Sequence, residues 1–163
     1  MRVLVTGATG FVGGRLAASL SERGMDVRGL VRDRERAADL SAAGLELHQG
    51  DVLDADSLRG AGEGISTAYY LVHSMGRGGG PDGFAEREHR AASNFARMAK
   101  EEGVERVVYL GGLGDERSEH LRSRAATAAT LAQRWCTSGR AWWSGRAASR
   151  TAPCATWSSG CRR

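Results

Sequence analysis

The sequence predicts an α/β fold in which a doubly wound parallel sheet is covered by helices on both faces. Short β-rich runs alternate with segments of helical periodicity over the first 110 residues. A glycine-rich turn joins the first strand to the first helix, and a long apolar run lies in the middle of the series. At 163 residues, the chain has room for one such domain.

Strand-like runs are recognisable at five places, namely residues 2–6, 27–31, 45–47, 65–72 and 105–110. The fourth, ISTAYYLV, is apolar along most of its length. Strands buried on both faces of a parallel sheet have such sequences, so this strand is expected at the centre. Five strands make up most of a doubly wound sheet, and its second half is begun but incomplete.

Helices are expected at residues 11–23, 34–43, 55–59 and 84–102. The first and last show apolar residues at helical spacing and are followed by Gly24 and Gly103, which are typical helix ends. Residues 76–83, GRGGGPDG, contain five glycines and one proline and are expected to form a loop. The apolar face of the helix at 84–102 is a possible surface for a homodimer.

The first strand runs into Gly7-Ala8-Thr9-Gly10-Phe11-Val12-Gly13, a GxxGxxG pattern. In such a turn the first glycine permits the tight bend, the second lets a pyrophosphate approach the backbone, and the third lets the helix pack on the strand. The helix N-terminus then offers N–H groups to the anion. Because this pattern follows a strand and opens a helix, it predicts a Rossmann-like dinucleotide site rather than a turn without a ligand.

The residues after the second strand, Arg32-Asp33-Arg34-Glu35-Arg36, bear on the choice of cofactor. NADP sites place an arginine at the 2′-phosphate, whereas NAD sites place an acid at the ribose 2′-hydroxyl. Arg32 directly follows the strand, so NADP(H) is favoured over NAD(H). Asp33 keeps NAD(H) open as the alternative, and Arg36 fits a solvated charged face.

The ends of the third and fourth predicted strands contribute further candidate residues for the cofactor site. In Gly50-Asp51-Val52, the carboxylate can accept from the adenine amino group and the valine can pack on the ring; a plain turn is the alternative. Leu71, Val72 and His73 end the fourth strand, at the sheet edge where ligands bind. An imidazole titrates near neutral pH, so His73 is a candidate proton donor, with a structural hydrogen bond as the alternative.

Charge and composition divide the chain. Residues 1–121 carry a net charge of −4, whereas residues 122–163 carry +8 and contain all four Trp and all three Cys. The basic excess lies wholly in this last stretch, so a nucleic-acid partner is not expected. No run is long and apolar enough for a membrane span, and the N-terminus does not resemble a signal peptide. The cysteine spacing indicates neither zinc nor a disulfide framework, which favours a reducing, cytoplasmic setting.

The ordered motifs VLVTGATGFVGGRL, LVRD, GD, YYLVHSM and AASNFARMAKEEGVERVVYLGGLGD resemble the atypical short-chain dehydrogenase/reductases. They are most similar to the NmrA-like, NAD(P)H-binding branch, often labelled NAD-dependent epimerase/dehydratase. The resemblance covers residues 1–124 and implies a cofactor-binding domain. It also implies that Asn94 supports the site and that Gly111 and Gly112 edge the nicotinamide pocket. The cofactor-binding positions that it implies are Gly7, Thr9, Gly10, Phe11, Val12, Gly13, Arg32, Asp51, Val52, Leu71, Val72 and His73.

The chain departs from active members of that family in its catalytic groups. Most of them carry a Tyr with a Lys four residues later, whereas the one Lys of this chain is Lys100, inside the last predicted helix. His73 or Tyr70 is therefore the candidate proton donor. The leading hypothesis is an oxidoreductase or epimerase-like enzyme with an unknown small-molecule substrate. The alternatives are a non-catalytic NADP(H) redox sensor and a non-functional truncated product.

Residues 125–163 have the amino-acid composition expected when GC-rich DNA is translated in a shifted reading frame. Trp and Cys codons both begin with TG, so moving the frame back by one base turns each of these seven sites into Leu, Met or Val. Residues 138–146 then read Gly-Pro-Gly-Val-Val-Val-Gly-Pro, which looks like a sixth strand and its turn. As encoded, this segment is expected to be an aberrant, poorly packed tail, and a genuine disordered basic tail is the alternative.

Overall fold

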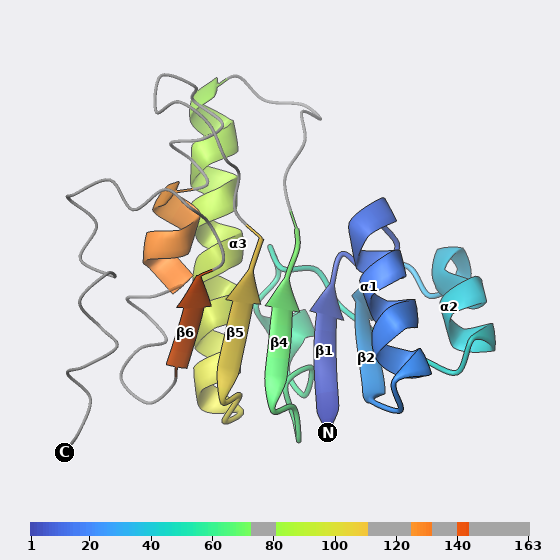
Figure 1. The fold of residues 1–163 in the computed structure, drawn as a ribbon. Helices are drawn as coiled ribbons and strands as arrows, with labels where there is room; N and C mark the ends of the chain where they lie inside the picture. Colours follow the sequence, from blue (N-terminus) through green and yellow to red (C-terminus); the bar gives the residue numbers. More distant parts are fainter. Residues whose placement is uncertain (73–80, 111–124, 132–139, 144–163) are drawn as a thin grey trace, which may run out of the picture.

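The computed structural model describes residues 1–72, 81–110, 125–131 and 140–143 (Figure 1). Its centre is a six-stranded sheet of order β3-β2-β1-β4-β5-β6 in which every pairing is parallel. The predicted Rossmann-like α/β fold is thus confirmed. The strands are β1 Arg2–Thr6, β2 Asp26–Val31, β3 Glu46–Gln49, β4 Thr67–Tyr70, β5 Arg106–Tyr109 and β6 Arg140–Trp143.

Helices cover both faces of the sheet. They are α1 Phe11–Glu22, α2 Ala38–Ala42 and α3 Pro81–Glu101, with short 3-10 turns at Glu35–Ala37 and Asp56–Leu58 and a further helix at 125–131. Alternate residues of β1 point into two hydrophobic cores, one on each face of the sheet. Val3 and Val5 belong to the core that contains residues of α1. Leu4 belongs to the core that contains residues of α3. Figure 1 shows α1 and α3 against opposite faces of the sheet.

The apolar face of α3 is used inside this molecule. Ala92, Phe95, Ala96 and Ala99 are fully buried and belong to the core between the helix and the sheet. This face therefore does not provide the dimer surface that the sequence suggested. Among the described helices, none is long and apolar enough to cross a membrane.

Several elements differ in extent from the sequence-based expectation. The expected helix at 34–43 is a 3-10 turn followed by the five-residue α2, and the one at 55–59 is a 3-10 turn. Helix α3 begins at Pro81, inside the stretch expected to be a loop. Proline suits the first position of a helix because its N–H would have no partner there.

Two elements lie in the segment 125–163, which was expected to be a poorly packed tail. The helix at 125–131 buries Thr127, Thr130 and Leu131, which share one helical face, and Leu131 joins the core that contains Phe95. Nδ1 of His89 on α3 lies 3.1 Å from Oγ1 of Thr130. Strand β6 pairs with β5, and it falls within residues 138–146, the stretch that reads Gly-Pro-Gly-Val-Val-Val-Gly-Pro in the preceding frame.

Candidate functional site

The turn between β1 and α1 is built from glycines. Gly7 has a φ of +67°, a conformation that glycine adopts readily. The N–H of Gly10 donates to the carbonyl of Gly7 at 2.9 Å. A β-carbon at position 13 would lie 2.7 Å from the carbonyl carbon of Gly7 and closer still to its oxygen. The first turn of α1 can therefore pack against the end of β1 only because Gly13 has no side chain.

The N-terminus of α1 is open to an anion. Gly10 caps the helix without a side-chain bond, and the first turn contains no acidic residue. The N–H groups of Phe11, Val12 and Gly13 have no acceptor among the described residues. Phe11 is 76% exposed, and the guanidinium of Arg15 lies 4.4 Å from the centre of its ring. Free N–H groups at the positive end of the helix dipole suit a phosphate.

The loop after β2 leaves one arginine free. Arg32 is exposed, and no described residue forms a hydrogen bond or ion pair with its guanidinium. The carboxylate of Asp33 is already engaged: Oδ1 accepts from the backbone N–H groups of Glu35 (2.9 Å) and Arg36 (3.3 Å). Its Oδ2 lies 3.3 Å from Nε of Arg36. Asp33 thus caps the following 3-10 turn, and Arg32 remains available to an anionic ligand.

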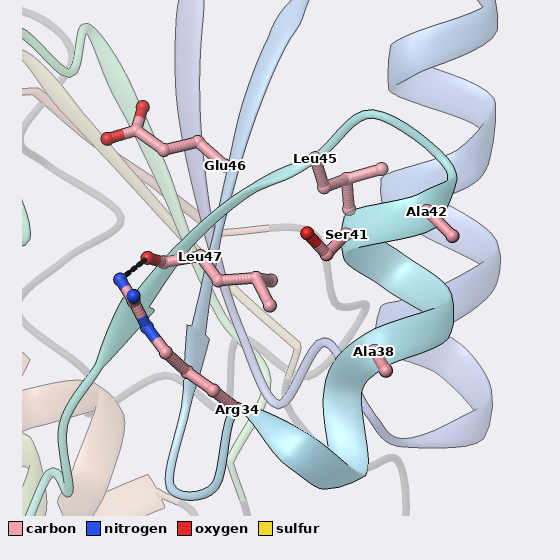
Figure 2. Close-up of a pocket in the computed structure, with 7 residues that line it drawn as sticks. All are labelled: Arg34, Ala38, Ser41, Ala42, Leu45, Glu46 and Leu47. Atoms are coloured by element: carbon pink, nitrogen blue, oxygen red, sulfur yellow. Dashed lines mark hydrogen bonds between the residues drawn. The ribbon is translucent and has the colours of Figure 1, made fainter.

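The side chain of Arg34 is engaged by the neighbouring strand β3. Its guanidinium donates to the carbonyl of Leu47 at 2.6 Å, on the outer edge of β3 (Figure 2). It borders an open groove of about 630 Å³ between α2 and β3. The residues that line the groove include neither the glycine turn nor the loop after β3. This groove is therefore separate from the candidate site.

The loop after β3 is closed by its own hydrogen bonds. A β-carbon on Gly50 would lie 2.6 Å from the carbonyl oxygen of Ser57. The Ser57 hydroxyl accepts from the N–H of Asp51 at 2.9 Å, and Oδ1 of Asp51 accepts from the N–H of Leu53 at 2.9 Å. No described residue bonds to Oδ2 of Asp51 or to the N–H of Val52. An acceptor beside a donor complements the amino group and ring nitrogen at one edge of adenine.

Thr6 joins the ends of β1 and β4. Its hydroxyl donates to the carbonyl of Tyr69 at 3.2 Å and accepts from the N–H of Leu71 at 2.9 Å. These bonds hold Leu71 beside the glycine turn, where a β-carbon on Gly7 would lie 3.5 Å from the Leu71 carbonyl oxygen. Thr6 was not among the site residues predicted from the sequence. The signal that was available is a hydroxyl at the end of an otherwise apolar strand.

Tyr70 lies in the core rather than at the sheet edge. The residue is fully buried, and its ring packs on Phe95 (4.8 Å between ring centres) and Tyr109 (6.1 Å). Burial raises the pKa of the Tyr70 hydroxyl far above its ordinary value, and the carboxylate of Glu88 raises it further. No described residue bonds to this hydroxyl. The location argues against the role of proton donor that the sequence suggested.

Some of the remaining candidate site residues lie in the described part of the chain, and others do not. The first turn of α1, Arg32, Asp51 and Val72 all follow the carboxyl ends of neighbouring parallel strands. His73, Gly111 and Gly112 lie outside the described residues. Within the described part of the chain, no cluster of His, Cys, Asp and Glu side chains is arranged to hold a metal ion.

The fold and the site together define a dinucleotide-binding α/β protein. The chain belongs to the NAD(P)H-binding family, whose sequence model matches residues 7–140. The resemblance to short-chain dehydrogenase/reductase and epimerase/dehydratase proteins is thereby confirmed.

Several of the similar proteins carry the names of oxidoreductases. The chain is 36% identical over 117 residues to 3 beta-hydroxysteroid dehydrogenase/Delta 5-->4-isomerase of Mycobacterium tuberculosis, over 66% of this chain and 30% of that protein. Triphenylmethane reductase of Citrobacter sp., complexed with NADP(H), matches with a TM-score of 0.66 at 25% identity, over 81% of this chain and 45% of that one. The NADPH-dependent quinone oxidoreductase QOR2 of Escherichia coli, complexed with NADPH, matches with a TM-score of 0.65 at 25% identity, over 82% and 45%. The chain thus spans less than half the length of these three proteins.

Proposed function

We propose that this chain is the cofactor-binding part of an oxidoreductase that uses NADP(H) in preference to NAD(H). The observation that carries the preference is the contrast between Arg32 and Asp33. The guanidinium of Arg32 is exposed and free among the described residues, whereas the carboxylate of Asp33 is held by two backbone N–H groups. An arginine at this position suits the 2′-phosphate of NADP(H). An acid whose Oδ1 already accepts two backbone N–H bonds has less acceptor capacity left for the ribose 2′-hydroxyl of NAD(H).

The other parts of the dinucleotide fit neighbouring positions. The pyrophosphate fits the free N–H groups of Phe11, Val12 and Gly13 at the start of α1. The adenine fits Oδ2 of Asp51 and the N–H of Val52. The nicotinamide half would then extend past Leu71 and Val72, which His73 follows in the sequence. With these contacts, the proposed cofactor would lie across the carboxyl ends of β1 to β4.

The reaction class follows from the cofactor. When bound, NADPH supplies a hydride from its nicotinamide ring to a carbonyl or enone carbon of a small substrate. The protein must orient the ring and supply a proton to the atom that gains negative charge. His73 is the proposed proton donor, because it follows Val72 at the carboxyl edge of the sheet and an imidazole titrates near neutral pH.

A redox sensor that binds NADP(H) without turnover is the second candidate. It is favoured by the burial of Tyr70 and by the absence of a Tyr-x-x-x-Lys pair from the sequence. Oxidation of NADPH by any carbonyl substrate in the presence of this chain would exclude it. Binding without turnover, with different affinities for NADP⁺ and NADPH, would support it.

The test of the cofactor preference compares NADPH with NADH by calorimetry, for the wild-type chain and for Arg32→Ala. Loss of a charge-assisted contact should weaken NADPH binding by about 10- to 100-fold, while NADH binding changes little. Arg36→Ala is the control, because Arg36 is also exposed but pairs with Asp33. Equal losses for both cofactors, or an effect of Arg36→Ala as large as that of Arg32→Ala, would contradict the proposal.

A further inference from the structure

One side chain on α3 reaches the loop that follows β3. Nδ2 of Asn94 donates to the carbonyl oxygen of Val52 at 3.0 Å. Oδ1 of Asn94 accepts from the guanidinium of Arg97 at 3.1 Å, which fixes the orientation of the amide. Asn94 is half-buried, whereas Arg97 is exposed. The bond therefore joins the long helix to the loop across 42 positions of sequence.

The same peptide group is bonded at both ends. The carbonyl of Val52 and the N–H of Leu53 belong to one planar peptide unit. Asn94 donates to the carbonyl, and Oδ1 of Asp51 accepts from the N–H at 2.9 Å. Hydrogen bonds that run in one direction through a peptide polarise and strengthen one another. The orientation of the Asp51 carboxylate is thus linked to Asn94 through this peptide.

The remaining restraints on the loop act on either side of that peptide: the N–H of Asp54 donates to the carbonyl of Asp51 at 2.9 Å, and Leu53 packs against the core. The Val52 side chain is 7% exposed and packs in the core, which fixes its position but not the rotation of the following peptide. The Ser57 hydroxyl holds the N–H of Asp51, on the other side of Val52. With Oδ1 engaged by Leu53, Oδ2 of Asp51 is the oxygen left for a ligand.

We propose that Asn94 is a positioning residue for adenine recognition: through the Val52–Leu53 peptide it orients the Asp51 carboxylate toward the adenine amino group. This inference rests on the proposed function, since it needs a dinucleotide at the site. It gives different roles to Asp51 on the loop and Asn94 on α3. Asp51 touches the base, whereas Asn94 acts only through the peptide.

The test uses NADPH and its hypoxanthine analogue, in which a carbonyl oxygen replaces the adenine amino group. Wild type should prefer adenine by about tenfold or more, because a carbonyl oxygen facing a carboxylate cannot donate a hydrogen bond. Asn94→Ala should lower this preference by about 3- to 10-fold, the equivalent of one lost hydrogen bond. Asn94→Asp, of nearly the same shape, should lower it at least as far, because it removes the donor.

Two comparisons separate positioning from general damage. Ser93→Ala is the control on the same helix, since the Ser93 hydroxyl has no hydrogen-bond partner among the described residues; it should leave the adenine preference unchanged. The preference for NADPH over NADH depends on Arg32 and should survive in Asn94→Ala. Asn94→Ser provides a second variant if the alanine variant does not fold.

The results of this test distinguish a failure of the Asn94 proposal from a failure of the proposed function. If wild type binds NADPH in preference to NADH and the Asn94 variants keep the full adenine preference, the role of Asn94 is overturned and the proposed function stands. If the Asn94 variants lose both preferences together, Asn94 is a general structural residue and its positioning role is overturned. If wild type binds neither dinucleotide, both proposals are overturned.

Discussion

Gly13 and Gly7 approach so closely that a β-carbon at position 13 would lie 2.7 Å from the carbonyl carbon of Gly7. The glycine pattern is therefore a packing requirement as well as a path for the ligand. The helix can direct its free N–H groups at the end of β1 only while position 13 lacks a side chain and position 7 keeps its positive φ. This relationship ties stability and cofactor binding to the same residue.

Replacing Gly13 with alanine should both destabilise the chain and abolish dinucleotide binding. Overpacking of this kind typically costs about 1–3 kcal/mol, because α1 must shift away from β1. Thermal unfolding and NADPH titration measure the two effects. Gly83→Ala in α3 is the matched control: a β-carbon there meets nothing within 4 Å. That control should stabilise the chain by roughly 0.5–1 kcal/mol through helix propensity. A fully stable Gly13→Ala variant that binds NADPH normally would contradict this interpretation.

Replacing Thr6 with valine should loosen the end of β4 from β1. The variant keeps the shape of the side chain but loses the bonds to the Tyr69 carbonyl and the Leu71 N–H. A loss of about 1–3 kcal/mol of stability is expected, because two backbone groups are left without partners. Urea unfolding measures it. Thr6→Ser restores the hydroxyl and should recover most of the loss, and equal stability of the valine variant and wild type would refute the role of Thr6.

Tyr70→Phe should change the response of the chain to alkaline pH. Burial raises the pKa of Tyr70 in the folded state, so above pH 10 the unfolded chain releases a proton that the folded chain retains. The contribution of this hydroxyl to stability is complete below pH 10 and declines as the pH rises further. The phenylalanine variant lacks this decline. Urea unfolding at pH 9 and pH 11 tests the prediction, and identical pH dependence in the two proteins would count against it.

The alternation of strand and helix patterns was sufficient to predict the parallel sheet and the glycine turn, because both depend on local sequence. The depth of Tyr70 could not be predicted in the same way. Alternation places Ala68 and Tyr70 on one face of β4, but Phe95 and Tyr109, which bury that face, come from distant elements. The capping role of Asp33 was also missed, since an acid after β2 is equally compatible with a ribose contact.

The segment 125–163 offers a test of the shifted-frame interpretation. We expect the chain to gain stability when this segment is replaced by the translation of the preceding frame. Two of the seven Trp and Cys positions, Trp142 and Trp143, lie in β6 and would then carry Val, which suits a strand beside β5. Thermal unfolding of the two chains measures the difference. An unchanged or lower midpoint in the replaced chain would contradict the shifted-frame interpretation.

The most direct test of the central claim is a calorimetric titration of the wild-type chain with NADPH. The account predicts saturable binding of one NADPH per chain, at a site that includes the glycine turn and Arg32. A matching rise in thermal stability is expected, about 2.7 kcal/mol when NADPH is present at one hundred times its dissociation constant. A folded chain that shows neither heat of binding nor stabilisation with NADPH would contradict the account.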